Sequence, residues 1–316
     1  MVLRSTSARR PNRFLNPVLV AAAAVLAFSP RAGVAQAADA QAQPVIDVHV
    51  HALGKAGDAA FLAMMDTLNV RHAVYIGVPG SLAVGVAAAP DRLIPAVTFP
   101  CENGRMPTSG IPCFGDGREF PDLVALRSSI ASGDVRVLGE VNAQYMGLAP
   151  NDSRLEPYFA LAEEMGVPVA LHMGFGAAGV AYAGAGFPPQ KSPAFRGEAG
   201  KPLRLEDVLV RHPRLRLYVA HAAWPFLDDM TYLLYMHPQL YVDVSVLQYA
   251  IPRPAYYRYL RTLVEAGFGK RLMFGSDGSA RRLKEGVLAI READFLSDAE
   301  KRDILHDNAA RFFGLP

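Results

Sequence analysis

Short runs of Val, Ile and Leu recur along the chain between residues 45 and 277. Eight of these runs have the length of a β-strand: Val45–His51, His72–Val78, Leu93–Phe99, Val135–Val141, Pro168–Gly174, Leu215–Ala222, Leu240–Val246 and Arg271–Asp277. Continuous apolar runs of this length are typical of strands that are buried on both faces of a parallel sheet. The pattern therefore predicts eight parallel strands.

Stretches with apolar residues at helical spacing separate most of these runs. They are Asp58–Leu68, Phe120–Ser132, Arg154–Met165, Leu205–Arg211, Pro225–Met236 and Pro254–Ala266. Gly133, Gly166 and Gly267 follow predicted helix ends, as left-handed caps do. The segment Ser297–Glu300 predicts a capping box that opens a last helix, which ends at Gly314.

Eight buried strands that alternate with helices within about 250 residues predict an α/β fold, a single-domain (β/α)8 TIM barrel. A doubly wound open sheet is the alternative, but the glycine-rich phosphate-binding segment expected after its first strand is missing. Two long connections, Pro100–Glu119 and Phe175–Pro202, follow the third and fifth strands. We expect both to act as lids over the face where the active sites of such barrels lie.

The first 37 residues have the layout of a secretory signal peptide. A basic leader precedes an apolar, alanine-rich run from Pro17 to Phe28, and Ala35-Gln36-Ala37 offers a small-x-small cleavage site. The apolar run is short for a membrane span, so an uncleaved N-terminal anchor is the less favoured alternative. We expect the chain to be exported to the periplasm or secreted, with residues 38–44 a short linker and residues 45–316 the barrel domain.

The net charge of the chain without its leader indicates which classes of binding partner to expect. The whole chain carries 32 Lys and Arg against 30 Asp and Glu, a formal charge of +2, and 51% of its residues are hydrophobic. The leader contains five arginines and no acid, so its removal changes the charge from +2 to −3. No basic patch then favours nucleic acid, and we expect a small-molecule substrate and no stable membrane association after cleavage. The oligomeric state is left open.

The two cysteines, Cys101 and Cys113, lie twelve positions apart in a segment rich in Gly and Pro. This spacing lacks the short Cys-x-x-Cys geometry of a zinc knuckle. Because an exported protein meets an oxidising compartment, a disulfide that closes the loop is favoured over a pair of metal thiolates.

The first predicted strand carries two histidines on one face. Asp47, His49 and His51 alternate with apolar residues, and successive side chains of a strand point to opposite faces. Two neutral imidazoles at the end of a strand can share a metal ion, although a polar strand face without a metal is an equally good reading of this segment alone. Asp47 either orients His49 by a hydrogen bond or bonds within the barrel floor.

Further candidate ligands lie at the ends of the fourth, fifth, sixth and eighth strands: Glu140, His172, His221 and Asp277. A lone buried histidine is usually a satisfied core residue. Four histidines and two carboxylates at one barrel mouth, however, would leave many buried polar groups without partners unless a metal is bound. The other histidines fall away from this face, and we interpret them as structural or solvent-facing: His72, His212, His237 and His306.

Imidazoles combined with carboxylates select a borderline divalent ion, with Zn²⁺ preferred and Mn²⁺, Fe²⁺ or Co²⁺ as alternatives. An ion with an open coordination position lowers the pKa of a bound water to about 7. Asp277 is then a candidate ligand and general base, and His221 either polarises a substrate carbonyl or binds a second ion. These are the parts of a metal-dependent hydrolase.

This residue set, in this order and on these strands, resembles the amidohydrolase superfamily. More narrowly, Asp47–His51, the later strand-end ligands and the ending Asp307–Leu315 are similar to its amidohydrolase-related branch (amidohydrolase 2), which contains TIM-barrel hydrolases and decarboxylases. The resemblance implies four metal ligands, and His221 as a ligand or catalytic residue; the four are His49, His51, His172 and Asp277.

The fourth strand departs from the best-known pattern of that superfamily. It has no lysine, so a carboxylated lysine cannot bridge two ions there, and Glu140 stands in its place. With two ions, Glu140 joins a site made by the first and eighth strands to one made by His172 and His221. With one ion, which we favour, His172 turns to the first site and Glu140 becomes a base or a hydrogen-bonding partner.

We therefore expect an exported metal-dependent hydrolase that uses a metal-activated water on an amide, ester or lactone carbonyl of a small molecule. The first alternative is a metal-dependent decarboxylase of a small carboxylic acid, and a remote one is a non-catalytic barrel that binds a ligand or a metal. Residues that follow strand ends either line a substrate pocket or simply pack: Gln144, Tyr145, Phe175, Trp224 and Tyr249. Arg281 and Arg282 either receive a carboxylate or form a solvated helix start, which is the favoured reading.

Overall fold

The computed structural model describes residues 43–106, 110–182 and 192–316. Its strands follow one another in chain order, each parallel to its neighbours: β1 (Val45–His51), β2 (Val70–Gly77), β3 (Leu93–Phe99), β4 (Val137–Val141), β5 (Val169–Leu171), β6 (Leu217–Val219), β7 (Tyr241–Asp243) and β8 (Leu272–Met273). Hydrogen bonds from Val48 N to Phe274 O, at 2.9 Å, and from Asp277 N to His49 O, at 2.7 Å, join the end of β8 to β1. The sheet closes on itself, and the predicted (β/α)8 barrel is confirmed.

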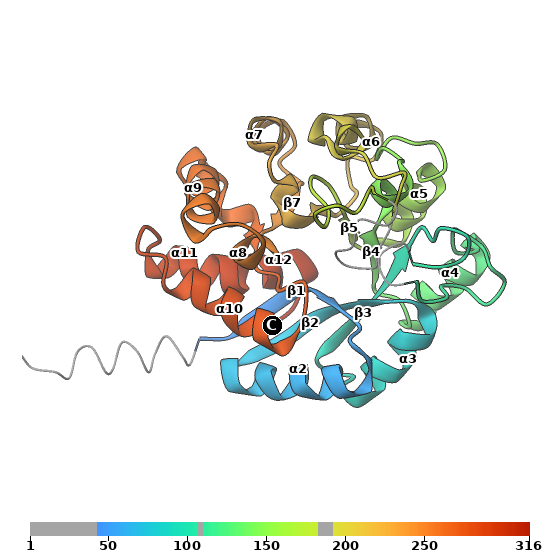
Figure 1. Cartoon of the computed structure of the whole chain (residues 1–316), viewed down its shortest axis with the longest axis horizontal. Coiled ribbons are helices and arrows are strands. Elements are labelled where there is room, and N and C mark those ends of the chain that lie inside the picture. Colours follow the sequence, from blue (N-terminus) through green and yellow to red (C-terminus); the bar gives the residue numbers. More distant parts are fainter. Residues whose placement is uncertain (1–42, 107–109, 183–191) are drawn as a thin grey trace, which may run out of the picture. The chain divides into compact units, whose positions relative to one another are not determined.

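Helices occupy the connections and surround the strands (Figure 1). The α-helices are α2 (Gly54–Leu68), α3 (Pro79–Ala88), α4 (Leu123–Ser132), α5 (Glu156–Met165), α6 (Glu206–Arg211), α7 (Leu227–Met236), α8 (Leu247–Ala250), α9 (Arg253–Leu263), α10 (Ala280–Arg291), α11 (Asp298–Arg302) and α12 (Asn308–Phe313). Short 3-10 or π turns are η1 (Ala143–Met146), η2 (Gly197–Gly200), η3 (Pro202–Leu205), η4 (Ala220–Ala223), η5 (Val264–Phe268), η6 (Gly269–Arg271) and η7 (Asp303–Asp307). In the described ranges, no helix has both the length and the apolar character needed to cross a membrane.

Every predicted strand overlaps an observed one, but the later strands end sooner than their apolar runs. The run Arg271–Asp277, for example, contains a strand of only two residues, Leu272–Met273. Three helices, α3, the four-residue α8 and α10, were absent from the predicted helical stretches, although a helix start was favoured at Arg281 and Arg282. The sequence of α3 is apolar almost throughout and contains two glycines, so no helical period is visible in it.

The predicted helix boundaries are confirmed at five places. Gly133, Gly166, Gly267 and Gly314 all adopt positive φ angles, of 85°, 66°, 89° and 67°. At the start of α11, the Ser297 side chain accepts from the backbone of Glu300, and the Glu300 carboxylate accepts from the backbone of Ser297. These caps satisfy backbone groups that the helices leave unpaired.

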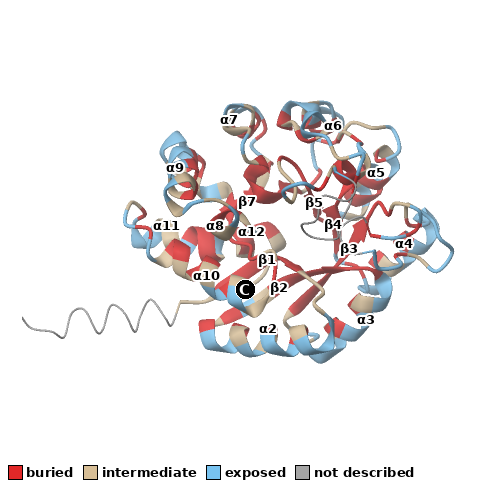
Figure 2. Cartoon of the chain, in the orientation of Figure 1, coloured by how far each residue is buried: buried red, intermediate tan, exposed pale blue. Residues whose placement is uncertain are grey.

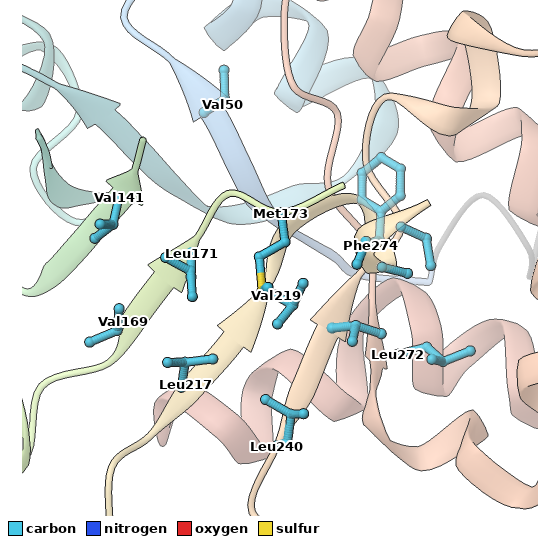
Figure 3. Packing of buried hydrophobic residues seen from close by; sticks show 14 of the residues in the cluster. Val50, Val141, Val169, Leu171, Met173, Leu217, Val219, Leu240, Leu272 and Phe274 are labelled. Carbon is cyan, nitrogen blue, oxygen red and sulfur yellow. The ribbon is translucent and has the colours of Figure 1, made fainter. Parts of the chain in front are cut away.

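Buried side chains form two layers on the strands. One layer packs the strands against the helices, and Figure 3 shows part of it, with Val169 and Leu171 of β5 beside Leu217 and Val219 of β6. The second layer gathers residues of seven strands, such as Ile94 of β3, and lies inside the ring. Figure 2 shows the same division: the strands are buried, and exposed residues lie on the outer faces of the helices.

Helix α12 covers the end of the barrel where the strands begin. Phe312 packs 4.8 Å, centre to centre, from the ring of Tyr241, which opens β7, and the guanidinium of Arg216, just before β6, lies 5.4 Å from the Phe312 ring. Ala309 and Phe312 belong to the same buried cluster as the interior strand residues. Among the described residues, the barrel therefore has a closed apolar floor at this end, and the polar strand ends lie at the opposite mouth.

The two long connections leave that mouth, as expected. In the first, Cys101 and Cys113 are joined by a disulfide, which confirms the expected pairing. In the second, the backbone of Gly174 donates to Gly200 O at 3.1 Å and so brings the two ends of the loop together. The role of both connections as lids stays a prediction. The predicted signal peptide, residues 1–37, lies outside the described residues.

Candidate metal centre

Strand β1 brings His49 and His51 together at the mouth. Their Nε2 atoms lie 3.3 Å apart; the His49 side chain is fully buried and that of His51 is 33% exposed. We expected successive side chains of β1 to alternate between its two faces. This alternation holds only in part, because the pairing of β1 with β2 shifts register between Asp47 and Val50. Val50 packs towards the helices, whereas Ile46 and Val48 belong to the interior cluster. Both histidines still face the mouth, as predicted.

Glu140 on β4 lies between the two groups of histidines. Its Oε2 is 3.4 Å from His51 Nε2 and 3.7 Å from His49 Nε2, while its Oε1 is 2.7 Å from His172 Nδ1 and 3.3 Å from His221 Nε2. The preceding Gly139 has a φ angle of 143°, and a Cβ there would lie 2.5 Å from the carbonyl oxygen of Ala170. Only glycine fits at this position, and this backbone turns the Glu140 carboxylate into the mouth.

Asp277 and His221 follow strand ends in left-handed backbone conformations. Asp277 has a φ angle of 48°, and His221, Ala222 and Ala223 in η4 have angles of 57°, 45° and 52°. The Asp277 Oδ1 atom lies 3.3 Å from His51 Nε2 and 3.8 Å from His49 Nε2. Non-glycine residues in this region cost roughly 1–3 kcal/mol each and persist where the surrounding structure holds them.

All six predicted ligands therefore meet at one place. Their nitrogen and oxygen atoms form three overlapping groups within 4.8 Å: His49, His51 and Glu140; His49, His221 and Asp277; and Glu140, His172 and His221. The four histidines that we interpreted as structural lie elsewhere. His212, for instance, lies between the Glu163 and Glu156 carboxylates, at 3.1 and 3.0 Å.

The donor set fits a divalent cation. Among the described residues, no Lys or Arg forms an ion pair with the Glu140, Asp243 or Asp277 carboxylates. His172 Nε2 is buried and has no hydrogen-bond partner in the described part of the chain. Buried carboxylates need a cation nearby, and imidazole with carboxylate suits a borderline metal such as Zn²⁺. The residues present therefore fit the ion that the chemistry requires.

Charges and hydrogen bonds within the cluster shift the pKa values of its groups. Burial raises the pKa of Glu140, but the charges of His172 and His49 outweigh this effect and hold that pKa well below its usual range. In the same way the pKa of Asp277 falls to about 2, chiefly because His51 donates to it. Burial lowers the pKa of His51, but hydrogen bonds to Asp277 and Glu140 raise it to about 9. A bound metal must displace these protons.

Asp47 does not contact the imidazole of His49. Its Oδ1 accepts from the backbone N–H groups of His49, at 3.0 Å, and Ser276, at 2.9 Å, and so ties β1 to the segment after β8. Burial raises the pKa of Asp47 to about 7. The sequence offered a bond to the His49 ring or a bond in the barrel floor; Asp47 instead bonds backbone N–H groups in the barrel wall.

Asp243, at the end of β7, orients the His49 ring instead, and the sequence interpretation missed it. Its Oδ2 lies 3.0 Å from His49 Nδ1, and both side chains are fully buried. A signal was present: Asp243 and Ser245 alternate along the seventh predicted strand as Asp47, His49 and His51 do along the first. Carboxylates at this distance from a metal-binding histidine fix the orientation of its ring.

The rim of the mouth carries aromatic residues. The Tyr145 ring lies 4.8 Å from that of His172, and the Phe175 ring lies 5.9 Å from that of His221 and 5.1 Å from that of Trp224. Gln144, by contrast, is buried and donates to Gly174 O at 2.7 Å, so its amide supports the loop.

Arg281 and Arg282 differ in their surroundings. Arg281 is 73% exposed and pairs with Glu285. Arg282 is partly buried; it donates to the backbone oxygen of Asp277 at 3.2 Å, and its guanidinium lies 4.4 Å from the centre of the Tyr249 ring. No acidic side chain of the described residues pairs with Arg282, so the solvated helix start that the sequence favours describes Arg281 alone.

Comparisons with known proteins agree with this fold. The family model described as Amidohydrolase matches residues 51–315, and no curated protein matches the chain. Among solved structures, an uncharacterized TIM-barrel protein from Bordetella bronchiseptica is similar over 86% of this chain and 98% of its own, with 15% identity and a TM-score of 0.60. A 5-carboxyvanillate decarboxylase from Sphingomonas paucimobilis shares 15% identity over 87% and 99% of the two chains, with a TM-score of 0.56. A probable 2-pyrone-4,6-dicarboxylic acid hydrolase from Acinetobacter baumannii shares 15% over 86% and 99%, with a TM-score of 0.57.

Proposed function

Because the chain belongs to the amidohydrolase family, we propose that it is a metal-dependent hydrolase of an amide, ester or lactone carbonyl in a small molecule. The observation that carries the proposal is the meeting of four histidines and two carboxylates at the barrel mouth, in three overlapping groups of ligand atoms. The family is metal-dependent, and its members act on small molecules. The reaction and the substrate of this chain are the proposed part.

The six residues have distinct roles in this proposal. His49, His51, His172 and Asp277 would hold one divalent ion, with Zn²⁺ preferred. When bound, such an ion polarises a carbonyl and lowers the pKa of a water to about 7. Asp277 accepts the proton of the attacking water, since its carboxylate is ionised and reaches the mouth. His221 polarises the carbonyl oxygen or donates a proton to it, and Glu140 holds His172 and His221 in place.

A second arrangement of metals follows from the position of Glu140. Its two oxygens face different histidines, Oε2 towards β1 and Oε1 towards His172 and His221. A carboxylate placed in this way can also bridge two ions. We keep a single ion as the proposal, because the three groups of ligand atoms overlap. His49 belongs to two of these groups, and His221 also belongs to two.

Decarboxylation of a small carboxylic acid is the alternative reaction. It is supported by the similar fold of a decarboxylase and by Arg282, a partly buried cation next to Asp277 with no acidic partner among the described residues. A guanidinium in this position can receive a substrate carboxylate. A carboxylate on the substrate fits both reactions, since the similar pyrone hydrolase is named for a dicarboxylic acid.

Two panels of substrates test the proposal. Purified protein loaded with Zn²⁺ is assayed for hydrolysis of esters, amides and lactones, with and without an added carboxylate, and in parallel for carbon dioxide release from aromatic and unsaturated carboxylic acids. We expect hydrolysis that Asp277→Asn abolishes. Carbon dioxide release without hydrolysis would establish the alternative, and tightly held metal with no turnover on either panel would indicate a binding protein.

We further propose that the chain is exported and that its leader is removed after Ala37. The proposal rests on the basic leader, the apolar run and the small-x-small site of the sequence. Intact-mass measurement of the protein from the producing cell should give a chain that starts near Ala38. A cytoplasmic protein that begins at Met1 would contradict it.

A further inference from the structure

Asp243 and Ser245 connect two histidines of the metal centre that come from different strands. Asp243 Oδ2 lies 3.0 Å from His49 Nδ1, and Asp243 Oδ1 accepts from the backbone N–H groups of His221, at 3.0 Å, and Ser245, at 2.9 Å. Ser245 Oγ lies 2.5 Å from Asp243 Oδ1 and 2.9 Å from His221 Nδ1. All four residues are at most 3% exposed, so their polar groups must find hydrogen-bond partners among one another.

The number of hydrogens fixes the direction of each bond. A serine hydroxyl has one hydrogen, and that of Ser245 lies between its Oγ and Asp243 Oδ1, because two oxygens at this separation repel unless a hydrogen joins them. Asp243 supplies no hydrogen to Ser245, since its Oδ1 already accepts from two backbone N–H groups. The hydrogen between Asp243 Oδ2 and His49 Nδ1 stays on the imidazole, because imidazole is a stronger base than a carboxylate. Towards imidazole nitrogens the Ser245 hydroxyl can then only accept, and these are His221 Nδ1, at 2.9 Å, and His49 Nδ1, at 3.3 Å. The hydrogen of the bond between Ser245 and His221 therefore lies on His221 Nδ1.

We infer that Asp243 and Ser245 are positioning residues that hold both His49 and His221 with a hydrogen on Nδ1. His49 donates to Asp243 directly, and His221 donates to Asp243 through the hydroxyl of Ser245. In each ring Nε2 then faces the centre, where His221 Nε2 lies 3.3 Å from Glu140 Oε1 and His49 Nε2 lies 3.3 Å from His51 Nε2. A metal that binds there would displace any hydrogen from these Nε2 atoms. A free nitrogen lone pair is the form of imidazole that binds a metal or accepts a proton.

Close approach of three strand ends makes this connection possible. Gly275, after β8, passes between His49 and Ser245, and a Cβ there would lie 2.8 Å from His49 Cβ and 2.9 Å from Ser245 Cβ. Any side chain at 275 would push apart the two residues that share the Asp243 carboxylate. The inference rests on the proposed function only in treating His221 as part of the metal centre.

The native protein tests the inference without any substitution. In long-range ¹H–¹⁵N spectra of the Zn²⁺-loaded, ¹⁵N-histidine-labelled protein, we expect His221 to show a protonated Nδ1 and an unprotonated Nε2. The His221 signals are assigned by their loss in His221→Asn. A hydrogen on Nε2 of His221 in the native protein would overturn the inference.

Two matched serine variants separate positioning from packing. Ser245→Ala removes the acceptor of the His221 Nδ1–H, so we expect both tautomers of His221 to be populated and Zn²⁺ affinity or turnover to fall on the order of 10-fold to 100-fold. Ser276→Ala is the control: Ser276 is also fully buried, but its hydroxyl bonds the backbone oxygen of His49, at 3.4 Å, and no imidazole. In this control the histidine tautomers should remain as in the native protein.

The outcomes also separate this inference from the proposed function. A protein inert on every substrate panel but with Nδ1 of His221 protonated would refute the function and support the inference. A Ser245→Ala protein whose His221 keeps the native tautomer would refute the inference and leave the function standing. If Ser245→Ala does not fold, the spectrum of the native protein decides alone.

Discussion

The same strands form the floor and the mouth of the barrel, but apolar side chains fill the floor and polar or charged side chains line the mouth. The floor consists of tightly packed apolar side chains such as Ile94, closed by Phe312 of α12. The mouth contains buried carboxylates and imidazoles, and Asp277 and His221 hold left-handed backbone angles. Buried polar groups and strained residues cost stability, which the apolar floor must offset. Stability and chemistry are thus separated along the barrel axis, and each can be tested without the other.

Removal of the metal should have the largest effect. Because the proposed chemistry depends on the ion, dialysis against a chelator should reduce turnover to background, while the far-UV circular dichroism that reports the barrel stays unchanged. Titration with Zn²⁺ should restore full activity at one equivalent. Activity that appears only with the second equivalent would contradict the single ion and support a bridging Glu140.

Asp277→Asn should have the next largest effect on turnover. The amide cannot accept the proton of the attacking water, so we expect kcat to fall on the order of 10²-fold or more. The fold should remain, since Asn has nearly the same shape. Asp294→Asn, an exposed carboxylate away from the mouth, is the matched control. Near-normal turnover of Asp277→Asn would exclude Asp277 as the base.

The two neighbouring arginines at the start of α10 provide a finer test of the mouth. If Arg282 receives a substrate carboxylate, Arg282→Ala should raise KM for such a substrate by roughly 10-fold to 100-fold, as expected for the loss of a charged hydrogen bond of about 1.5–3 kcal/mol. Arg281→Ala should leave KM unchanged, because Arg281 is exposed and pairs with Glu285. Equal effects of the two substitutions would refute a specific role for Arg282.

Ile94→Ala should have the smallest effect on turnover and a clear effect on stability. Ile94 is 3% exposed in the floor, and truncation of such a side chain typically lowers the free energy of unfolding by about 2–5 kcal/mol. Urea unfolding measures this loss, and kcat per folded molecule should stay at the native value. Val124→Ala, at a position that is 78% exposed, should change stability by less than about 0.5 kcal/mol. A large loss of kcat in Ile94→Ala would show that floor and mouth are coupled.

The sequence predicts the barrel and the six ligands for the same reason. Parallel strands all end at one face, so a polar residue at the end of an apolar run is placed without knowledge of packing. Glu140, His172, His221 and Asp277 were found in this way. Asp243 was not found in this way, because the seventh run was recognised by its apolar residues. A single acidic residue in such a run is equally typical of a strand end that is exposed to water.

Other features depend on distances in the folded structure that cannot be read from the sequence. Whether Arg281 or Arg282 turns towards the mouth depends on the rotation of α10 and on Gly278, where a Cβ would lie 2.4 Å from the Arg282 side chain. The bond between Asp243 and the His49 ring joins residues 194 positions apart, and it requires the stagger of a closed barrel. The two oxygens of Glu140 face different groups of histidines, and this arrangement also requires the stagger of the closed barrel.

The position of α12 has a consequence for the order in which the protein can fold. Phe312 seals a floor whose first residues, Ile46 and Val48, are made more than 260 residues earlier, and Phe274 N also bonds to Ile304 O, at 2.8 Å. A growing chain therefore exposes the rings of Tyr218 and Tyr241 until its last turn of helix has been made. Native contacts this distant in sequence form slowly, and a chain that lacks them exposes apolar surface. The barrel is therefore complete only when the segment around Phe312 packs against residues of the first strand.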